Sequence, residues 1–377
     1  MKVVWVSHRS GLAGAELSLL EGTRGLVARG VMVEVVLPWA GPLGDRLREL
    51  GAGFTVLPHA RWASEGRSPV NTVRRLVRNA RSLRSFVGLL RGSGADLVVT
   101  NTVTAPLGAV AARLARVPHV WYVHEYGLEE HGVRFDLGRR TSLRLVGLLS
   151  DVVLVNSEAL RAALAPLLCL EPTRVYYAVD VPDREAPPAG EGPLRLVQVG
   201  TLAPGKGQLE AVRALGILAR RGADVRLRLV GPDLHGHAAT VLHAARSEQV
   251  ADRLEWVGYA EDPAEHVLAA DVALTCSRME AFGRTTVEAM KLGRPVVGAA
   301  SGGTGELVRD GWNGLLYPPG DAEALADRIE RLDRDRALLR KLAASAREWA
   351  RATFTLERFA DDLVAVFEVA VADRRAP

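Results

Sequence analysis

The sequence predicts an α/β protein with doubly wound parallel sheets, and three observations support this fold class. Short β-branched runs alternate with longer segments of helical periodicity along the chain. The β-branched runs are continuously apolar, which is typical of parallel strands covered by helices on both faces. The alternation occurs twice, separated by a proline- and glycine-rich segment at residues 181–193, which we interpret as an interdomain linker.

The first series occupies residues 1–180. Its expected strands lie at 3–6, 33–37, 54–57, 97–100, 120–123 and 152–155. Its expected helices lie at 15–29, 44–50, 70–90, 106–115 and 141–149. Such an order of elements predicts one doubly wound domain.

The second series follows the linker. Its expected strands lie at 196–199, 227–230, 254–257, 272–275 and 296–297, with helices between them and further helices at 322–332, 335–353 and 356–371. Ligands of open α/β sheets bind beyond the carboxyl ends of the strands. Two such domains would therefore form a binding site in the cleft between them.

Composition excludes several other classes of protein. The chain has 377 residues, of which 48% are hydrophobic, 24% charged and 5% aromatic, which excludes a disordered chain and a fibre. Cys169 and Cys276 are too few for a disulfide scaffold, lack metal-ligand spacing and fit a reducing cytosol. The first apolar run is too short for a signal peptide, and no stretch approaches the roughly 18 apolar residues of a membrane span. We therefore expect a cytoplasmic protein, or one attached only to the inner surface of the membrane.

The basic excess of the chain lies in its first half. Residues 1–180 contain 22 Lys and Arg against 15 Asp and Glu, whereas the net charge of the whole chain is +4. The expected helix at 70–90 carries an apolar stripe and an arginine-rich face, formed by Arg74, Arg75, Arg78, Arg81 and Arg84. Two interpretations stay open, namely contact with anionic lipid and a solvated helix over the sheet. Nucleic acid is excluded as a partner, because aromatic residues are few and no recognition motif is present.

In each expected domain, a glycine-rich loop follows the first strand. Gly11-Leu-Ala-Gly14-Ala-Glu16 opens a helix, where backbone amides favour a phosphate, but it does not complete the dinucleotide-binding pattern. In the second domain, the loop after Gly200 contains Lys206, one of only four lysines in the chain. A fixed cation among backbone donors suits a phosphate, and the alternative is a solvated surface lysine.

Two carboxylates mark a third candidate segment, Glu280-Ala-Phe-Gly-Arg-Thr-Thr-Val-Glu288. Eight residues correspond to about 80° of rotation on a helix, so the two side chains do not share a helical face. We therefore predict that Glu280 lies in a loop and that Glu288 lies within the following helix. A carboxylate can accept both hydroxyls of a ribose diol, although Glu288 could also be an acid favoured by the helix dipole.

These loops, together with Ser301-Gly-Gly-Thr-Gly-Glu306 and the Asp310-Gly-Trp-Asn-Gly that follows, carry a resemblance over essentially the whole chain. In order and spacing, the sequence resembles the retaining nucleotide-sugar glycosyltransferases of family 4, which have the GT-B fold. The resemblance implies an acceptor-binding domain over 1–180, a donor-binding domain over 194–355 and a last helix, 356–377, that packs back on the first domain.

The resemblance also implies roles for individual residues. Lys206 would bind the donor diphosphate, Glu288 would hold the ribose, and Glu280 would contact hydroxyls of the donor sugar. The other residues implied at the site are Gly14, His124, Phe282, Gly283 and Glu306. His124 would line the sugar and the reaction centre, and its alternative is a satisfied histidine at the end of a strand.

The sequence departs from the family pattern at two positions. Thr201 stands where the family often has an arginine that binds the diphosphate, so either another cation substitutes, with Arg284 and Arg278 as candidates, or the leaving group is held less tightly. Ala13 replaces the first glycine of the family's first loop, and its Cβ narrows the approach to a phosphate.

The expected reaction is transfer of a sugar from a UDP- or GDP-sugar to a hydroxyl acceptor, which in the family is often lipid-linked. Neither a cofactor nor a metal is expected, and Asp333 and Asp335 are interpreted as surface residues. Such a reaction would serve glycan, glycolipid or cell-surface polysaccharide biosynthesis. The alternatives are another GT-B enzyme, such as a nucleotide-sugar epimerase, and a catalytically silent protein that binds sugar nucleotides.

Overall fold

The computed structural model describes residues 1–64, 68–127, 132, 134–184, 187, 190–234 and 236–375, with side chains up to residue 372. Contacts divide the chain into two units. Unit 1 comprises Met1–Ala178 and Phe354–Pro377, and unit 2 comprises Val179–Thr353. The first boundary thus falls just before the expected linker, and the chain returns to unit 1 for its last helix.

Unit 1 is built on a seven-stranded sheet with the order β3-β2-β1-β5-β6-β8-β9, in which every pairing is parallel. The strands are β1 (Lys2–Val6), β2 (Met32–Leu37), β3 (Gly53–Val56), β5 (Leu97–Asn101), β6 (His119–Val123), β8 (Val152–Val155) and β9 (Thr173–Arg174). The central strands β5 and β6 are buried along their whole length, as their continuous apolar sequence predicts. A parallel sheet of this order confirms the predicted doubly wound fold for the first half.

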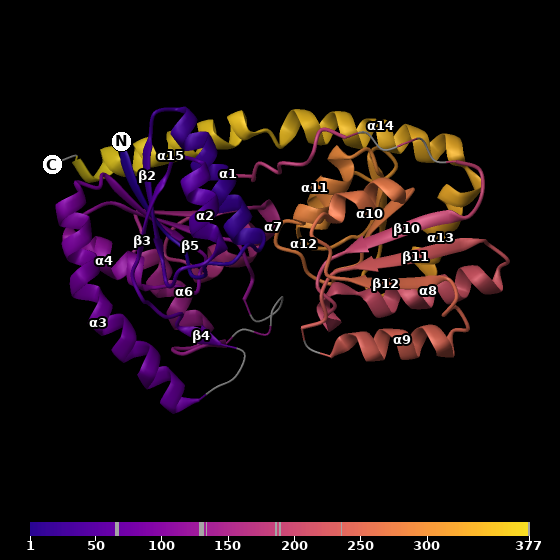
Figure 1. The fold of residues 1–377 in the computed structure, drawn as a ribbon, viewed down its shortest axis with the longest axis horizontal. Coiled ribbons are helices and arrows are strands. Elements are labelled where there is room, and N and C mark those ends of the chain that lie inside the picture. Colours follow the sequence, from indigo (N-terminus) through magenta and orange to yellow (C-terminus); the bar gives the residue numbers. More distant parts are fainter. Residues whose placement is uncertain are drawn as a thin grey trace. The chain divides into compact units, whose positions relative to one another are not determined.

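Helices cover the sheet of unit 1 (Figure 1). They are α1 (Gly14–Ala28), α2 (Pro42–Glu49), α3 (Pro69–Ser93), α4 (Leu107–Ala115), α6 (Arg139–Leu148), α7 (Glu158–Leu164) and α15 (Leu356–Arg375), with a 3-10 turn, η1, at Ala165–Leu167. The last helix, α15, packs against α1. Gly25 makes this approach possible, because a Cβ there would lie 2.6 Å from the Cβ of Ala360. Trp5 of β1 meets Phe367 of α15 edge to face, with ring centroids 6.4 Å apart.

The sequence analysis did not predict the helix α7 or three short strands of unit 1. Strands β4 (Ala63–Ser64) and β7 (Arg134–Phe135) form a two-residue antiparallel pair, and β9 adds two residues to the edge of the main sheet. Runs this short carry no periodicity, so their position depends on contacts between distant segments.

Unit 2 is built on a six-stranded parallel sheet with the order β12-β11-β10-β13-β14-β15. The strands are β10 (Leu194–Val199), β11 (Val225–Val230), β12 (Leu254–Gly258), β13 (Val272–Thr275), β14 (Val296–Ala299) and β15 (Gly314–Tyr317). The edge strand β15 was not expected, because its surroundings, rich in Gly and Asp, are typical of a loop.

The sheet of unit 2 lies between layers of helices. They are α8 (Gln208–Arg220), α9 (His237–Ser247), α10 (Pro263–Ala269), α11 (Arg284–Lys291), α12 (Gly302–Leu307), α13 (Ala322–Arg334) and α14 (Arg336–Thr353), with the 3-10 turn η2 at Pro204–Lys206. The core is aliphatic, with Leu196, Leu227 and Val272 of the strands against Leu215 of α8 and Leu325 of α13. The second half therefore also has the predicted α/β architecture.

Candidate functional site

The candidate loops of unit 2 follow three neighbouring strands. The Gly200 loop follows β10, the Glu280 loop follows β13, and the Ser301 turn follows β14, and these strands are adjacent in the sheet. Because all three strands are parallel, their carboxyl ends lie at one edge. The structure therefore brings together loops as distant in the sequence as Gly200 and Ser301.

Close backbone contacts join these three loops. Arg278 N donates to the carbonyl of Gly205 at 3.0 Å, and Gly303 N donates to the carbonyl of Glu280 at 2.7 Å. Gly207, at φ +73°, has no room for a side chain, because a Cβ would overlap the carbonyl of Cys276. A Cβ on Gly303 would likewise overlap the carbonyl of Phe282. The glycines of these loops are therefore required for close packing as well as for turning.

Lys206 and Glu280 meet at this edge. The ammonium Nζ of Lys206 lies 2.8 Å from Oε2 of Glu280, and the two side chains are 27% and 15% exposed. The carbonyl of Lys206 also accepts a hydrogen bond from Nε2 of Gln198 at 2.7 Å, which fixes the turn η2 on β10. Lys206 is thus held in an ion pair at the carboxyl end of the strands and is not a solvated surface lysine.

Glu288 lies on α11, and Glu280 lies in the loop before it, as the eight-residue spacing predicts. Gly283 caps the helix at φ +96°, a conformation that favours glycine. Arg284 Nε lies 3.0 Å from Oε1 of Glu288, four residues along the same helix. This arginine, a candidate second cation for the diphosphate, therefore lies directly beside the predicted ribose ligand.

The remaining predicted residues of unit 2 have different positions. Phe282 is buried, at 3% exposure. Thr201 follows Gly200, and its carbonyl accepts from Nε2 of Gln208 at 3.1 Å. Arg278 is exposed, and Glu306 lies half-buried on α12. The structure tests none of their proposed contacts with a donor, which stay predictions.

In unit 1, Gly14 is the first residue of α1 and is exposed, with open space around the position of a Cβ. The helix is capped by a residue that the sequence did not single out for this role. Oε2 of Glu16 accepts from the backbone N of Ala13 at 3.3 Å. Its Oε1 lies 3.3 Å from Nδ1 of His8, and burial raises the pKa of Glu16. The available sequence signal was a Glu three residues after the N-cap, which supplies one half of a capping box.

His124 lies in a closed hydrogen-bond network at the end of β6. Asn101 donates from Nδ2 to the carbonyl of Ala15 at 3.0 Å, so its Oδ1 faces Nε2 of His124 at 2.6 Å and accepts a hydrogen bond from the Nε2–H. Nδ1 of the neutral ring then accepts from the hydroxyl of Tyr177, whose oxygen accepts from Nδ2 of Asn156 at 2.7 Å. Burial lowers the pKa of His124 to about 3. Both ring nitrogens are engaged, which matches the alternative of a satisfied strand-end histidine, while a role at the reaction centre stays a prediction.

This network predicts an acid sensitivity of unit 1. Between pH 6.5 and about 3 the unfolded chain protonates His124 and the folded chain does not, so folding loses up to about 1.4 kcal/mol per pH unit as the pH falls. The His124→Gln variant, whose amide can donate and accept, should lose stability less steeply with acid. Urea unfolding at pH 7 and pH 5, followed by tryptophan fluorescence, measures the difference. His243→Gln, an exposed histidine on α9, is the control, and equal slopes in wild type and His124→Gln would contradict the expectation.

Glu125 is a residue that the sequence analysis missed. It accepts from the hydroxyl of Thr102 at 2.7 Å and from the backbone N of His124 at 3.2 Å, and burial raises its pKa to about 7. Thr102 has φ +86°, which is strained for a β-branched residue. A glutamate after a strand-end histidine was the available signal, but only the structure shows that it supports a strained turn.

The described residues contain neither a metal-binding cluster nor a membrane-spanning helix. Among them, no group of three or more His, Cys, Asp and Glu side chains is placed to hold a metal ion. Asp333 pairs with Arg336, 2.7 Å apart. Within the same residues, no helix has both the length and the apolar character needed to cross a bilayer.

Comparison with known proteins identifies the family. The family model described as "Glycosyl transferase 4-like domain" matches residues 13–180, and "Glycosyl transferases group 1" matches residues 182–349. The GDP-mannose-dependent alpha-(1-6)-phosphatidylinositol monomannoside mannosyltransferase of Mycobacterium tuberculosis is 31% identical over 287 residues, which cover 69% of this chain and 72% of that protein. The chain belongs to glycosyltransferase family 4.

Other relatives of this family 4 member match over shorter segments. The D-inositol 3-phosphate glycosyltransferase of Stackebrandtia nassauensis is 30% identical over 60% of this chain and 57% of its own length. The N-acetyl-alpha-D-glucosaminyl L-malate synthase of Bacillus anthracis is 30% identical over 38% of this chain and 37% of its own length. The chain thus spans about half the length, or less, of these two relatives.

Solved structures confirm the GT-B fold of this family 4 member. Anabaena HepE in complex with UDP has a TM-score of 0.81 at 24% identity and covers 98% of this chain and 100% of its own. Sucrose-phosphate synthase from Thermosynechococcus elongatus has a TM-score of 0.77 at 20% identity, with 99% and 100% covered.

Proposed function

We propose that the chain transfers a sugar from a nucleoside-diphosphate sugar to a hydroxyl acceptor. The observation that carries this proposal is the Lys206–Glu280 pair, at 2.8 Å, on the edge where the Glu288 helix also begins. A cation suits the diphosphate, and two carboxylates suit hydroxyls of a ribose and a sugar. One relative is named a GDP-mannose-dependent mannosyltransferase, and the solved structure of Anabaena HepE is a complex with UDP. Both support a UDP- or GDP-sugar as the donor.

The sugar-transfer step requires stabilisation of the leaving group and an acceptor for the hydroxyl proton. Lys206 and the loop amides would stabilise charge on the departing diphosphate, which is the largest requirement of this step. The bond from the anomeric carbon to the phosphate oxygen breaks, and a bond to the acceptor oxygen forms. We assign the acceptor proton to the departing phosphate oxygen, with retained configuration, so that no side chain is the nucleophile. No residue of the chain is assigned to a metal.

A donor panel tests the proposal. UDP- and GDP-sugars are each incubated with the protein, with and without candidate acceptors such as glycolipids extracted from membranes. The release of nucleoside diphosphate is measured. A transferase releases one nucleotide faster when its acceptor is present. An epimerase would interconvert donor sugars without an acceptor, and a silent protein would bind a donor without releasing nucleotide. Either of those results would replace the proposal.

We further propose that α3 contacts an anionic membrane on the cytoplasmic side, in keeping with a lipid-linked acceptor. This helix contains six arginines and no acidic residue in 25 positions. Its N-terminal half exposes an unusual set of apolar side chains, with Val70, Val73 and Leu76 each about 60% exposed. Exposed apolar residues beside clustered arginines are typical of helices that lie in a membrane interface. The phosphatidylinositol mannoside acceptor in the name of one relative supports the same class of surface.

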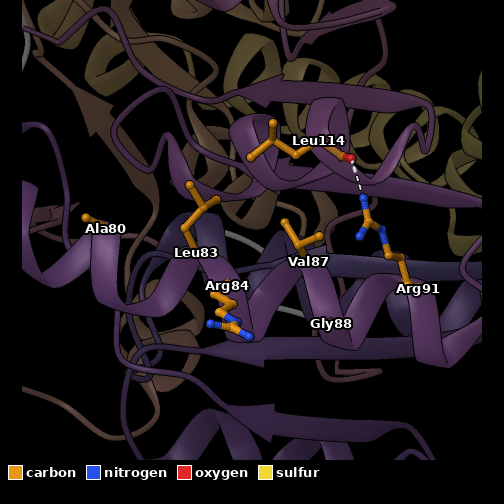
Figure 2. A pocket seen from close by; sticks show the side chains of 7 residues that line it. All are labelled: Ala80, Leu83, Arg84, Val87, Gly88, Arg91 and Leu114. Atoms are coloured by element: carbon orange, nitrogen blue, oxygen red, sulfur yellow. Dashed lines mark hydrogen bonds between the residues drawn. The ribbon is translucent and has the colours of Figure 1, made fainter.

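The pocket beside the C-terminal half of α3 extends this surface (Figure 2). It has a volume of about 560 Å³ and is lined by Ala80, Leu83, Arg84, Val87, Gly88, Arg91 and Leu114. Arg91 donates from Nη2 to the carbonyl of Leu114 at 3.1 Å, which ties α3 to α4. The apolar lining and the two arginines match the chemistry of a phospholipid.

Liposome co-sedimentation tests the membrane contact. We expect binding to phosphatidylglycerol vesicles at low salt and none to phosphatidylcholine vesicles. A triple exchange of Arg74, Arg78 and Arg81 to Gln should weaken binding about a hundredfold, because each arginine contributes about 1 kcal/mol near an anionic surface. The same exchange at three exposed arginines of unit 2, Arg331, Arg334 and Arg340, is the control. Equal binding of both variants would refute the contact.

A further inference from the structure

We propose that Glu280 distinguishes the intact donor from the spent nucleotide, because its carboxylate competes with a diphosphate for Lys206. The inference rests on the proposed function and adds a role in product release. Hydroxyls of the donor sugar donate hydrogen bonds to the Glu280 carboxylate. The nucleoside diphosphate product has no sugar, so Glu280 competes with its phosphates for Lys206.

The geometry of the pair provides the competitor. Oε2 of Glu280 lies 2.8 Å from Nζ of Lys206, the distance at which a phosphate oxygen would also bind the ammonium. Both side chains are mostly shielded from water, so the pair is less screened than a surface ion pair. A diphosphate that binds Lys206 must therefore displace Glu280 or lie beside its negative charge.

The backbone on both sides of the pair is held in place. The carbonyl of Glu280 accepts from Gly303 N at 2.7 Å, and a Cβ on Gly302 would overlap that same carbonyl. On the other side, Lys206 N donates to the carbonyl of Ala203 at 3.0 Å. Exchange of partners can therefore proceed by rotation of the two side chains, a ps–ns motion for exposed residues.

The intact donor and the product then differ in what they offer to Glu280. In the donor, sugar hydroxyls donate to the carboxylate while the phosphates take Lys206, so both members of the pair gain a new partner. In the product, the phosphates take Lys206 and the carboxylate receives no donor in exchange. The pair consequently weakens product binding more than donor binding, which favours turnover when product release limits the rate.

Arg284 and Glu288 form a second pair on the adjacent helix, but that pair does not supply the same selectivity. Glu288 would bind the ribose, which the donor and the product share. Displacement of Arg284 from Glu288 is therefore the same for both molecules. The distinction between donor and product is confined to the acid that faces the sugar.

The test measures binding of UDP and of GDP, each alone, by isothermal titration calorimetry. In Glu280→Gln, which keeps the size of the side chain and removes its charge, we expect the nucleotide from the active donor to bind about fivefold more tightly. We also expect a lower rate of transfer and stronger product inhibition in the same variant. Glu255→Gln is the matched control, since Glu255 pairs with Arg228 on the exposed surface of the same unit, at 2.7 Å.

A double-mutant cycle assigns the effect to the pair. The tighter binding should disappear when Glu280→Gln is combined with Lys206→Ala, because no ammonium is left to release. Unchanged or weaker nucleotide binding by a folded Glu280→Gln variant would overturn this inference and leave the proposed function standing. Failure of wild-type protein to bind either nucleotide would overturn both.

Discussion

Lys206→Ala is expected to lower the rate of sugar transfer by about 10²- to 10³-fold, the loss that follows removal of one preorganised stabiliser of developing negative charge. Lys206 is placed for this role by η2 and by its contact with Glu280. Nucleotide release from the active donor, with saturating acceptor, measures the effect. The turnover number should fall more than the donor's KM rises, because charge on the diphosphate grows as the bond breaks.

The fold should survive this change. Lys206 is 27% exposed, so loss of its ion pair should cost only about 1–2 kcal/mol of stability, less than the loss of a partner from a fully buried pair. The melting temperature of Lys206→Ala should therefore lie within a few degrees of that of the wild type. Lys341→Ala, an exposed lysine on α14, controls for the loss of a lysine in general. Undiminished transfer by Lys206→Ala would remove the cation from the mechanism and the proposed site with it.

The second large effect is expected for Gly207→Ala. Gly207 has φ +73°, and an added Cβ would overlap the carbonyl of Cys276. The left-handed conformation alone costs about 1 kcal/mol for alanine, and relief of the overlap requires the η2 turn to move away from the β13 loop. We expect a total loss of about 3 kcal/mol of stability in unit 2. Nucleotide binding should weaken in addition, because Lys206 is the preceding residue.

The chain offers a matched control for this change. Gly222 has φ +81°, and no atom lies within 4 Å of the position of a Cβ. Gly222→Ala therefore carries the backbone strain without the collision. Thermal unfolding and calorimetric nucleotide titration of both variants separate the two contributions. Equal destabilisation of the two variants, with unchanged nucleotide binding, would show that the close contact of Gly207 is dispensable.

Much of the fold was predictable from the sequence because it depends on local patterns. Continuous apolar runs predicted the central strands β5 and β6, and the eight-residue spacing placed Glu280 in a loop and Glu288 on α11. The strand β15 was not predictable, because its four residues follow a Gly- and Asp-rich turn. Its pairing with β14 depends on a tertiary contact that the pattern does not contain.

The candidate site was predicted in part for the same reason. Glycine loops and an isolated lysine are visible in the sequence, and the structure brings Lys206 to Glu280 across 74 positions. The closed network of His124 depends on Tyr177, 53 positions away, and on Asn101, 23 positions away. Residue spacing does not reveal such partners, so the engagement of both ring nitrogens could be learned only from the fold.

The discontinuity of unit 1 has a consequence for its synthesis. Residues 354–375 leave the ribosome after the whole of unit 2, yet α15 supplies Phe367 against Trp5 and Asp361 to Arg29, whose Nε lies 2.6 Å from Oδ1. The nascent N-terminal half must therefore wait, with part of its apolar surface uncovered, until unit 2 and then α15 have been synthesised. Unit 2, a contiguous stretch of polypeptide, can mature during that interval, which makes the amino-terminal half the one in greater need of chaperone protection.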